Sequence, residues 1–190
     1  MTSLSAMRRA PWRLILVALA FVSSATPSSR VTDEQPPETA GMSRPAIAET
    51  LLEWNPRLGP LRAARVAAGV LRCEREQGLP PQLVLAVMKK ESTARPWAKS
   101  PKGAVGLMQV MPHMFEVLDL PGSIAHLDTN IEAGCMLLSE NVERRGLKDG
   151  VSTYFWGTRI RGERYWLGVK AVLEDELLFD VEAYGDADKS

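Results

Sequence analysis

The segment MKKESTARPWAKSPKGAVGLMQVMP, residues 88–112, decides how this chain is interpreted. It joins the end of a predicted helix to a glycine-containing loop that closes on Gly106-Leu107-Met108-Gln109. Pro80 and Pro81 are expected to open that helix, since proline is tolerated in a first turn. Four side chains then follow at spacing i, i+3, i+4 and i+7: Val84, Val87, Met88 and Glu91. The sequence therefore places one carboxylate on the apolar face of a helix, at its last turn.

Glu91 is the candidate general acid. Apolar surroundings and the negative end of the helix dipole both disfavour a charged carboxylate, so we expect its pKa to be raised. A protonated carboxyl group can then donate to a glycosidic oxygen. Five neighbouring cations would oppose this if they faced the carboxyl group, although a solvated face is their ordinary role: Lys89, Lys90, Arg95, Lys99 and Lys102. Taken alone, Glu91 is better explained as a capped or paired glutamate at a helix end.

The loop after Glu91 has the composition of a binding surface. Gly103 and Gly106 allow a ligand chain to approach the backbone closely. Gln109 offers donors and an acceptor suited to sugar hydroxyl and N-acetyl groups. Met108 and Met111 would give a soft apolar wall beneath a sugar ring, but by composition both are expected in the core.

The remaining sequence predicts further helices and no convincing strand. Helical spacing and boundary residues delimit these elements: 46–54, 61–77, 130–145 ending at Gly146, 148–156 ending at Gly157, 163–179, and a short helix from Pro112. In the segment 61–77 the expected apolar stripe is Leu61, Ala64, Ala68 and Leu71. The predicted fold class is all-α, a compact helical bundle with a substrate groove, in one domain over residues 46–179.

The N-terminal residues have the pattern of an export signal. Three arginines precede the apolar run 14–22 and small polar residues follow, so residues 1–25 predict a signal peptide cleaved after Ala25. An uncleaved short anchor is the alternative, but the run is about half the length of a membrane span, and no stable span is expected in the mature chain. Residues 26–45 predict a disordered linker and residues 180–190 a frayed acidic tail. The protein is expected in the periplasm or cell envelope.

Composition argues against several other functions. The net charge is zero, so no overall field attracts nucleic acid. His113 and His126 are not clustered with cysteine or acidic residues, and neither a metal site nor a cofactor is predicted. Three further acids are expected at helix caps or on the surface: Asp119, Asp128 and Glu132.

The only two cysteines, Cys73 and Cys135, fall in separate predicted helices. After export they would meet an oxidising compartment in which a disulfide persists, and such a bridge would add roughly 4 kcal/mol of stability. Two small buried side chains in the core are the alternative.

Three blocks of the sequence resemble the soluble lytic murein transglycosylases, lysozyme-like SLT domains of glycoside hydrolase family 23 that cleave peptidoglycan strands. The first block is contiguous and specific: Glu91-Ser92, Ser100-Pro101-Lys102-Gly103-Ala104, and Gly106-Leu107-Met108-Gln109-Val110-Met111-Pro112. The other two are weaker in isolation: Asp128, Asn130-Ile131 and Gly134, then Tyr154, Gly157, Tyr165 and Val169. The resemblance covers roughly residues 79–173.

The resemblance implies an enzyme, a carbon–oxygen lyase acting on peptidoglycan. Glu91 would protonate the oxygen between N-acetylmuramic acid and N-acetylglucosamine. It would then take the proton of the muramoyl 6-hydroxyl as that hydroxyl attacks the anomeric carbon, leaving a 1,6-anhydromuramoyl end. The matching positions imply substrate contacts by Ser100, Gly106, Gln109, Met111 and Tyr154. Glycan strands of peptidoglycan are the implied partner, and an envelope-spanning protein assembly is a further candidate partner.

Two positions depart from the family pattern. Ala94 stands where an aromatic residue is usual, and Thr153-Tyr154-Phe155-Trp156-Gly157 lacks the usual asparagine after the tyrosine. Phe155, Trp156 and Trp166 are expected either in the core or stacked on sugars. Two other functions therefore stay open: a muramidase of the same fold that admits water, and a non-catalytic peptidoglycan-binding or scaffold module of an envelope assembly.

Overall fold

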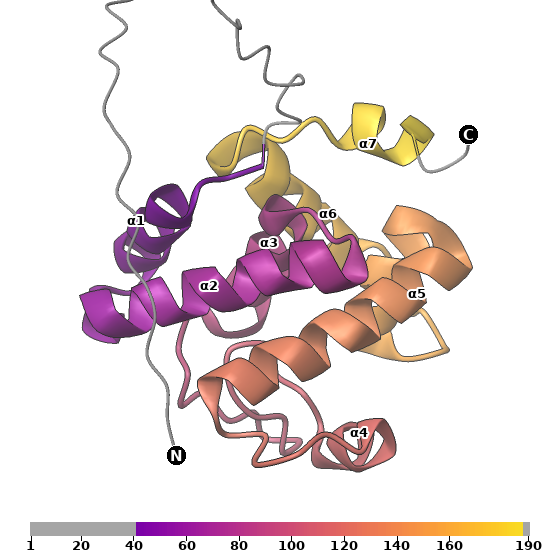
Figure 1. Ribbon diagram of the computed structural model, residues 1–190. Helices are drawn as coiled ribbons and strands as arrows, with labels where there is room; N and C mark the ends of the chain where they lie inside the picture. Colours follow the sequence, from indigo (N-terminus) through magenta and orange to yellow (C-terminus); the bar gives the residue numbers. More distant parts are fainter. Residues whose placement is uncertain (1–40, 188–190) are drawn as a thin grey trace, which may run out of the picture. The chain divides into compact units, whose positions relative to one another are not determined.

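A computed structural model describes residues 41–187 of the chain (Figure 1). Over this range the chain is helical, with isolated β-bridges in place of strands. The elements are α1 (Arg44–Trp54), a 3₁₀-helix η1 (Pro56–Leu58), α2 (Pro60–Gln77), α3 (Pro81–Ser92), α4 (Pro112–Leu118), α5 (Leu127–Trp156), α6 (Arg164–Ala171), a π-helical segment η2 (Val172–Glu176) and α7 (Val181–Ala187). The all-α prediction is confirmed.

None of the helices in residues 41–187 is long and apolar enough to cross a membrane. The predicted signal peptide, residues 1–25, lies outside the described residues, as does most of the predicted linker, residues 26–45. Export therefore remains a prediction from the sequence.

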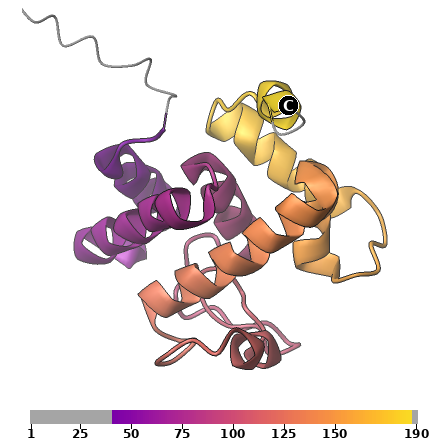
Figure 2. The same ribbon diagram turned by 45° about the vertical axis from the view of Figure 1, so that its right-hand side comes forward.

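Helix α2 packs between α1 and α5, as both views show (Figures 1 and 2). Its buried face differs from the predicted one: Ala63, Val66, Ala67, Val70 and Cys73 are buried, whereas Leu61 is 87% exposed. The predicted stripe was wrong in this respect, although Leu71 does pack against the core. Small apolar side chains lie on several faces of α2, and the position of the neighbouring helices decides which face is buried. A Cβ on Gly69 would lie 2.9 Å from Ile131 of α5.

Helix α3 is buried on all sides rather than on one stripe. Every residue from 81 to 88 is buried, including Gln82, and only the last turn approaches solvent. A helix that is apolar all round occupies the centre of a domain. The prediction was correct in placing Val84, Val87 and Met88 in the core, but it assigned only one face of the helix to the core, whereas all faces of residues 81–88 are buried.

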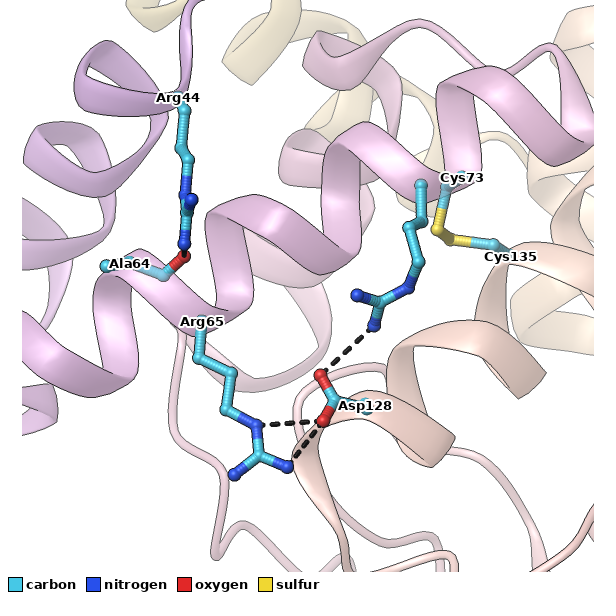
Figure 3. A network of polar contacts seen from close by, with 7 residues as sticks. Arg44, Ala64, Arg65, Cys73, Asp128 and Cys135 are labelled. Atoms are coloured by element: carbon cyan, nitrogen blue, oxygen red, sulfur yellow. Dashed lines mark hydrogen bonds and ion pairs between the residues drawn. A yellow bond between two sulfur atoms is a disulfide. The ribbon is translucent and has the colours of Figure 1, made fainter. Parts of the chain in front are cut away.

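Ion pairs, a hydrogen bond from Ser139 to the carbonyl oxygen of Gln77 and a disulfide join α2 to α5. The side chain of Asp128 accepts hydrogen bonds from Arg65, at 2.8 Å from Nε, and from Arg72 at 3.1 Å. The Arg65 hydrogen bond holds the pKa of Asp128 below its usual value. Further along the same two helices, Cys73 and Cys135 form a disulfide with a Cα–Cα distance of 5.9 Å. Figure 3 shows Asp128 facing Arg65 and the disulfide joining the same pair of helices.

The C-terminal part differs from its prediction in two places. The helix expected over residues 163–179 ends as a regular α-helix at Ala171 and continues as the π-helical segment η2, after which Leu178 adopts a positive φ of 49°. Of the predicted tail, residues 180–190, the structure describes 180–187, and Val181–Ala187 form α7, whose first residue is 5% exposed and packs on the core. The contact of Val181 with the core explains why a helix forms here, since the acidic composition of this segment alone predicts no ordered structure.

Candidate active site

Glu91 lies at the penultimate position of α3 and is partly buried. Its Oε1 atom accepts a 2.6 Å hydrogen bond from the hydroxyl group of Tyr165, which α6 supplies from 74 residues further along the chain. Burial raises the pKa of Glu91 to about 7, against the opposing effects of the Tyr165 hydrogen bond and the positive charge of Lys90. The carboxyl group can therefore exchange a proton near neutral pH.

Two tyrosines surround the carboxylate. Burial first, and then the charge of Glu91, raise the pKa values of Tyr154 and Tyr165 well above the ordinary value, so both hydroxyl groups keep their protons. Sequence reasoning placed Tyr154 in the site but left Tyr165 out. The position of Tyr165 in the third family-like block was the signal that could have identified it.

Phe155 supports Tyr165. The two rings stack with centroids 4.4 Å apart and planes inclined by 11°, and the Phe155 ring is itself 51% exposed. Trp166, by contrast, is 7% exposed and belongs to the core. Phe155, which stands where the family pattern has asparagine, thus helps to position the Tyr165 hydroxyl group that donates to Glu91.

The loop between α3 and α4 is fixed by hydrogen bonds from both sides. Ser92 donates from its hydroxyl group to the carbonyl oxygen of Leu107 at 2.7 Å, and the Tyr154 hydroxyl group donates to the carbonyl oxygen of Met108 at 2.7 Å. Asn130 of α5 accepts from the backbone N–H of Met108 at 2.9 Å. Its amide nitrogen donates to the carbonyl oxygens of Val105 and Ile124, at 2.9 and 3.0 Å.

We expect Asn130→Ala to lower the free energy of unfolding by about 2–3 kcal/mol, because it leaves the buried N–H of Met108 without an acceptor and removes one donor from each of the carbonyl oxygens of Val105 and Ile124. Urea denaturation monitored by circular dichroism measures this loss. Asn141→Ala, on the same helix and partly exposed, is the matched control. Equal stability of the two variants would contradict the assigned role of Asn130.

The predicted site residues gather along two adjoining hollows. Glu91, Ser100 and Gln109 line one of about 300 Å³, which we call the Glu91 pocket. Gln109, Met111 and Tyr154 line a second of about 410 Å³. Gln109 borders both, and its amide nitrogen donates to the carbonyl oxygens of Ala98 and Gly106, at 3.1 and 3.0 Å. A larger hollow of about 630 Å³ lies among α5, α6 and α7 and shares no lining residue with these two.

Gly106 lines neither hollow. Its φ of +82° favours glycine, and an added Cβ would lie 2.6 Å from the side chain of Asn130. The structure therefore uses this glycine to bring the loop against α5, and its contact with a substrate stays a prediction. Met108 is fully buried, as its composition predicted.

We expect Tyr165→Phe to raise the pKa of Glu91 further, because the lost hydrogen bond stabilises the charged carboxylate. If Glu91 acts as an acid, its protonated form then persists to higher pH. The alkaline limb of the pH–rate profile should move upward by about one pH unit, the equivalent of one hydrogen bond to a charged group. Phe115→Leu on α4, which lines neither hollow, serves as an aromatic control, and a profile that does not move in Tyr165→Phe would separate Tyr165 from the Glu91 ionisation.

Comparison with known proteins agrees with this geometry. Residues 70–163 match the family model for the transglycosylase SLT domain. The soluble lytic murein transglycosylase of Escherichia coli K12 is 30% identical over 110 residues, covering 53% of this chain and 17% of that protein. The transglycosylase of Enterobacteria phage PRD1 is 36% identical over 84 residues, covering 44% of this chain and 31% of that protein. The matches thus span less than a third of these relatives.

Among solved structures, an inactive mutant of the lytic transglycosylase Slt from Pseudomonas aeruginosa aligns with 70% of this chain and 27% of its own, at a TM-score of 0.45 and 21% identity. The family model is the more informative comparison, because it spans the segment from the middle of α2 to the residues before α6 and so contains Glu91 and the whole loop. With its all-α, lysozyme-like fold, the chain belongs to the SLT lytic transglycosylase family.

Proposed function

We propose that the chain is an exported lytic transglycosylase that cleaves peptidoglycan between N-acetylmuramic acid and N-acetylglucosamine, forming 1,6-anhydromuramoyl ends. The observation that carries the proposal is the Glu91 carboxyl group, which faces a hollow and has a pKa of about 7. At neutral pH a substantial fraction of such a group is protonated and can act as an acid. After donating its proton it is a base of matched strength.

Glu91 supplies both proton transfers in this mechanism. Its proton goes to the glycosidic oxygen as the bond to the anomeric carbon breaks, and the Tyr165 hydroxyl group, at 2.6 Å, stabilises the carboxylate that forms. That carboxylate then accepts the proton of the muramoyl 6-hydroxyl group as its oxygen bonds to the anomeric carbon of the same sugar. The two transfers restore the protonated carboxyl group, and no water is consumed.

The surroundings of Glu91 favour this intramolecular route. Hydrolysing glycosidases use a second carboxylate, about 5–9.5 Å from the first, either as nucleophile or to activate water. Within the described part of the chain, Glu91 is the only acid among the residues lining its pocket. A nucleophile supplied by the substrate itself removes the need for a second acid.

Export is supported by two independent features. The sequence of residues 1–25 has the arrangement of a signal peptide, and the Cys73–Cys135 disulfide suits an oxidising compartment. Peptidoglycan lies in such a compartment, where this chain would meet its substrate.

Digestion of purified peptidoglycan followed by mass spectrometry of the soluble products tests the proposal. Wild-type protein should release muropeptides that are lighter by one water than hydrolysed ones, and Glu91→Gln should release almost none. Hydrated reducing ends would instead establish a muramidase. Strand binding without any product would establish a recognition module.

A further inference from the structure

Trp97 is a large aromatic side chain that remains 58% exposed. It lines the Glu91 pocket together with Ala98 and Lys99. The same three residues also line a separate hollow of about 430 Å³, which we call the Trp97 pocket. Arg62 of α2 and Leu127 of α5 contribute to its lining as well. The indole therefore stands between two adjoining concave surfaces, one of which contains the candidate acid.

The backbone around Trp97 is rigidly held. The N–H of Ala98 donates to the carbonyl oxygen of Arg95 at 3.1 Å, closing a four-residue turn in which proline occupies the second position. The carbonyl oxygen of Ala98 in turn accepts from the N–H of Gly106 at 2.8 Å and from the side-chain amide of Gln109 at 3.1 Å. The exposure of the indole is thus a feature of a fixed loop, and a ligand would find the ring already in place.

The Trp97 pocket is also positively charged. Arg62 and Lys99, both exposed, contribute cations to its lining, which contains no acid. Elsewhere in the domain, exposed basic side chains such as Arg65 and Arg144 pair with carboxylates. No ion pair within residues 41–187 engages Arg62 or Lys99. Exposed apolar surface beside free cations suits a ligand that is both amphipathic and anionic.

We propose that the Trp97 pocket is a further subsite of the glycan groove, in which the indole stacks on a sugar ring and Arg62 and Lys99 pair with carboxylates of the peptide attached to that strand. The inference rests on the proposed function, because it extends the same groove away from Met111 and Tyr154. The apolar C–H face of a sugar ring matches the flat indole, and a muramoyl residue carries its acidic peptide stem on the adjoining side. The subsite would thus distinguish peptide-bearing strands from bare ones.

Binding to the inactive Glu91→Gln protein tests the subsite without cleavage of the ligand. Calorimetric titration with soluble glycan strands, with their peptide stems intact or enzymatically removed, gives the dissociation constants. Adding Trp97→Ala should weaken binding of both ligands by about tenfold, whereas Trp97→Phe should restore most of the affinity. Affinities within twofold of the parent after Trp97→Ala would overturn the proposal.

The charged part of the subsite is tested with the double variant Arg62→Gln and Lys99→Gln. It should weaken binding of peptide-bearing strands by about fivefold and leave bare strands unaffected, and added salt should reduce the difference. Arg159→Gln, exposed on another loop, is the control. Equal losses on both ligands, or no loss, would overturn the assignment to peptide carboxylates. Because binding is measured on Glu91→Gln, these outcomes are independent of whether the wild type yields anhydro products.

Discussion

Replacing Glu91 by Gln is expected to lower the rate of glycan cleavage by at least about 10²-fold while the protein remains folded. Gln has nearly the same shape and still offers an oxygen atom to the Tyr165 hydroxyl group, so the hydrogen bond between α3 and α6 survives. What is lost is the proton of Glu91, the only carboxyl group among the described residues that line the Glu91 pocket. Soluble muropeptide release per minute, quantified by chromatography, measures the effect.

The same substitution has an opposite effect on stability. The pKa of Glu91 is about 7 in the folded protein against an ordinary value of 4.5, so the folded state binds the proton more tightly than the unfolded state does. Its contribution to wild-type stability is fully present below pH 4.5 and is lost as the pH rises through 7. Glu91→Gln has no such dependence, and at pH 8 it should be more stable than the wild type by about 3 kcal/mol.

Urea denaturation at pH 4.5 and at pH 8 checks this expectation, with Glu49→Gln on the exposed surface of α1 as the control. A variant that loses activity but gains no stability at pH 8 would show that Glu91 is not held in a desolvated state. Full activity of Glu91→Gln would remove Glu91 from the mechanism altogether.

The sequence predicted the elements that depend on local signals. Gly78 ends α2 in a left-handed conformation, and Gly146, with a φ of 73°, interrupts α5 where a break was expected. Glu91 could be assigned because its helix and the glycine-containing loop are contiguous in the chain.

The contacts that sequence reasoning missed join distant segments. The Tyr165–Glu91 hydrogen bond spans 74 residues, and the stacking of Phe155 on Tyr165 depends on how α5 meets α6. The apolar face of α2 was misassigned for the same reason, since Leu61 and Ala63 differ in burial only through the position of a neighbouring helix. Tertiary packing, not propensity, decided these three features.

Breaking the Cys73–Cys135 disulfide should cause the largest loss of stability. The bridge closes a loop of 62 residues, and loss of that constraint on the unfolded chain is worth about 4 kcal/mol. A double variant, Cys73→Ala with Cys135→Ala, avoids burying a new polar group in the core, where both sulfur atoms now lie. Its urea midpoint should fall well below that of the oxidised wild type, and reducing agent should lower the wild type but not the variant.

Loss of the disulfide should also lower the thermal stability of the active site, although neither cysteine lines the Glu91 pocket or the second hollow. Cys135 follows Asp128 and Asn130 along the first turns of α5, and Asn130 holds the loop by three hydrogen bonds. When the disulfide is broken, two polar links between α5 and α2 remain. One is the hydrogen bond from the Ser139 hydroxyl group to the carbonyl oxygen of Gln77. The other, nearer the loop, is the ion-pair cluster of Asp128 and its two arginines, which is partly exposed and screened by salt. We therefore expect the double variant to cleave glycan normally at low temperature. On heating it should lose activity at a lower temperature than the oxidised wild type, and high salt should lower that temperature further. An unchanged inactivation temperature would mean that the packing of α2 against α5 alone holds the loop in place.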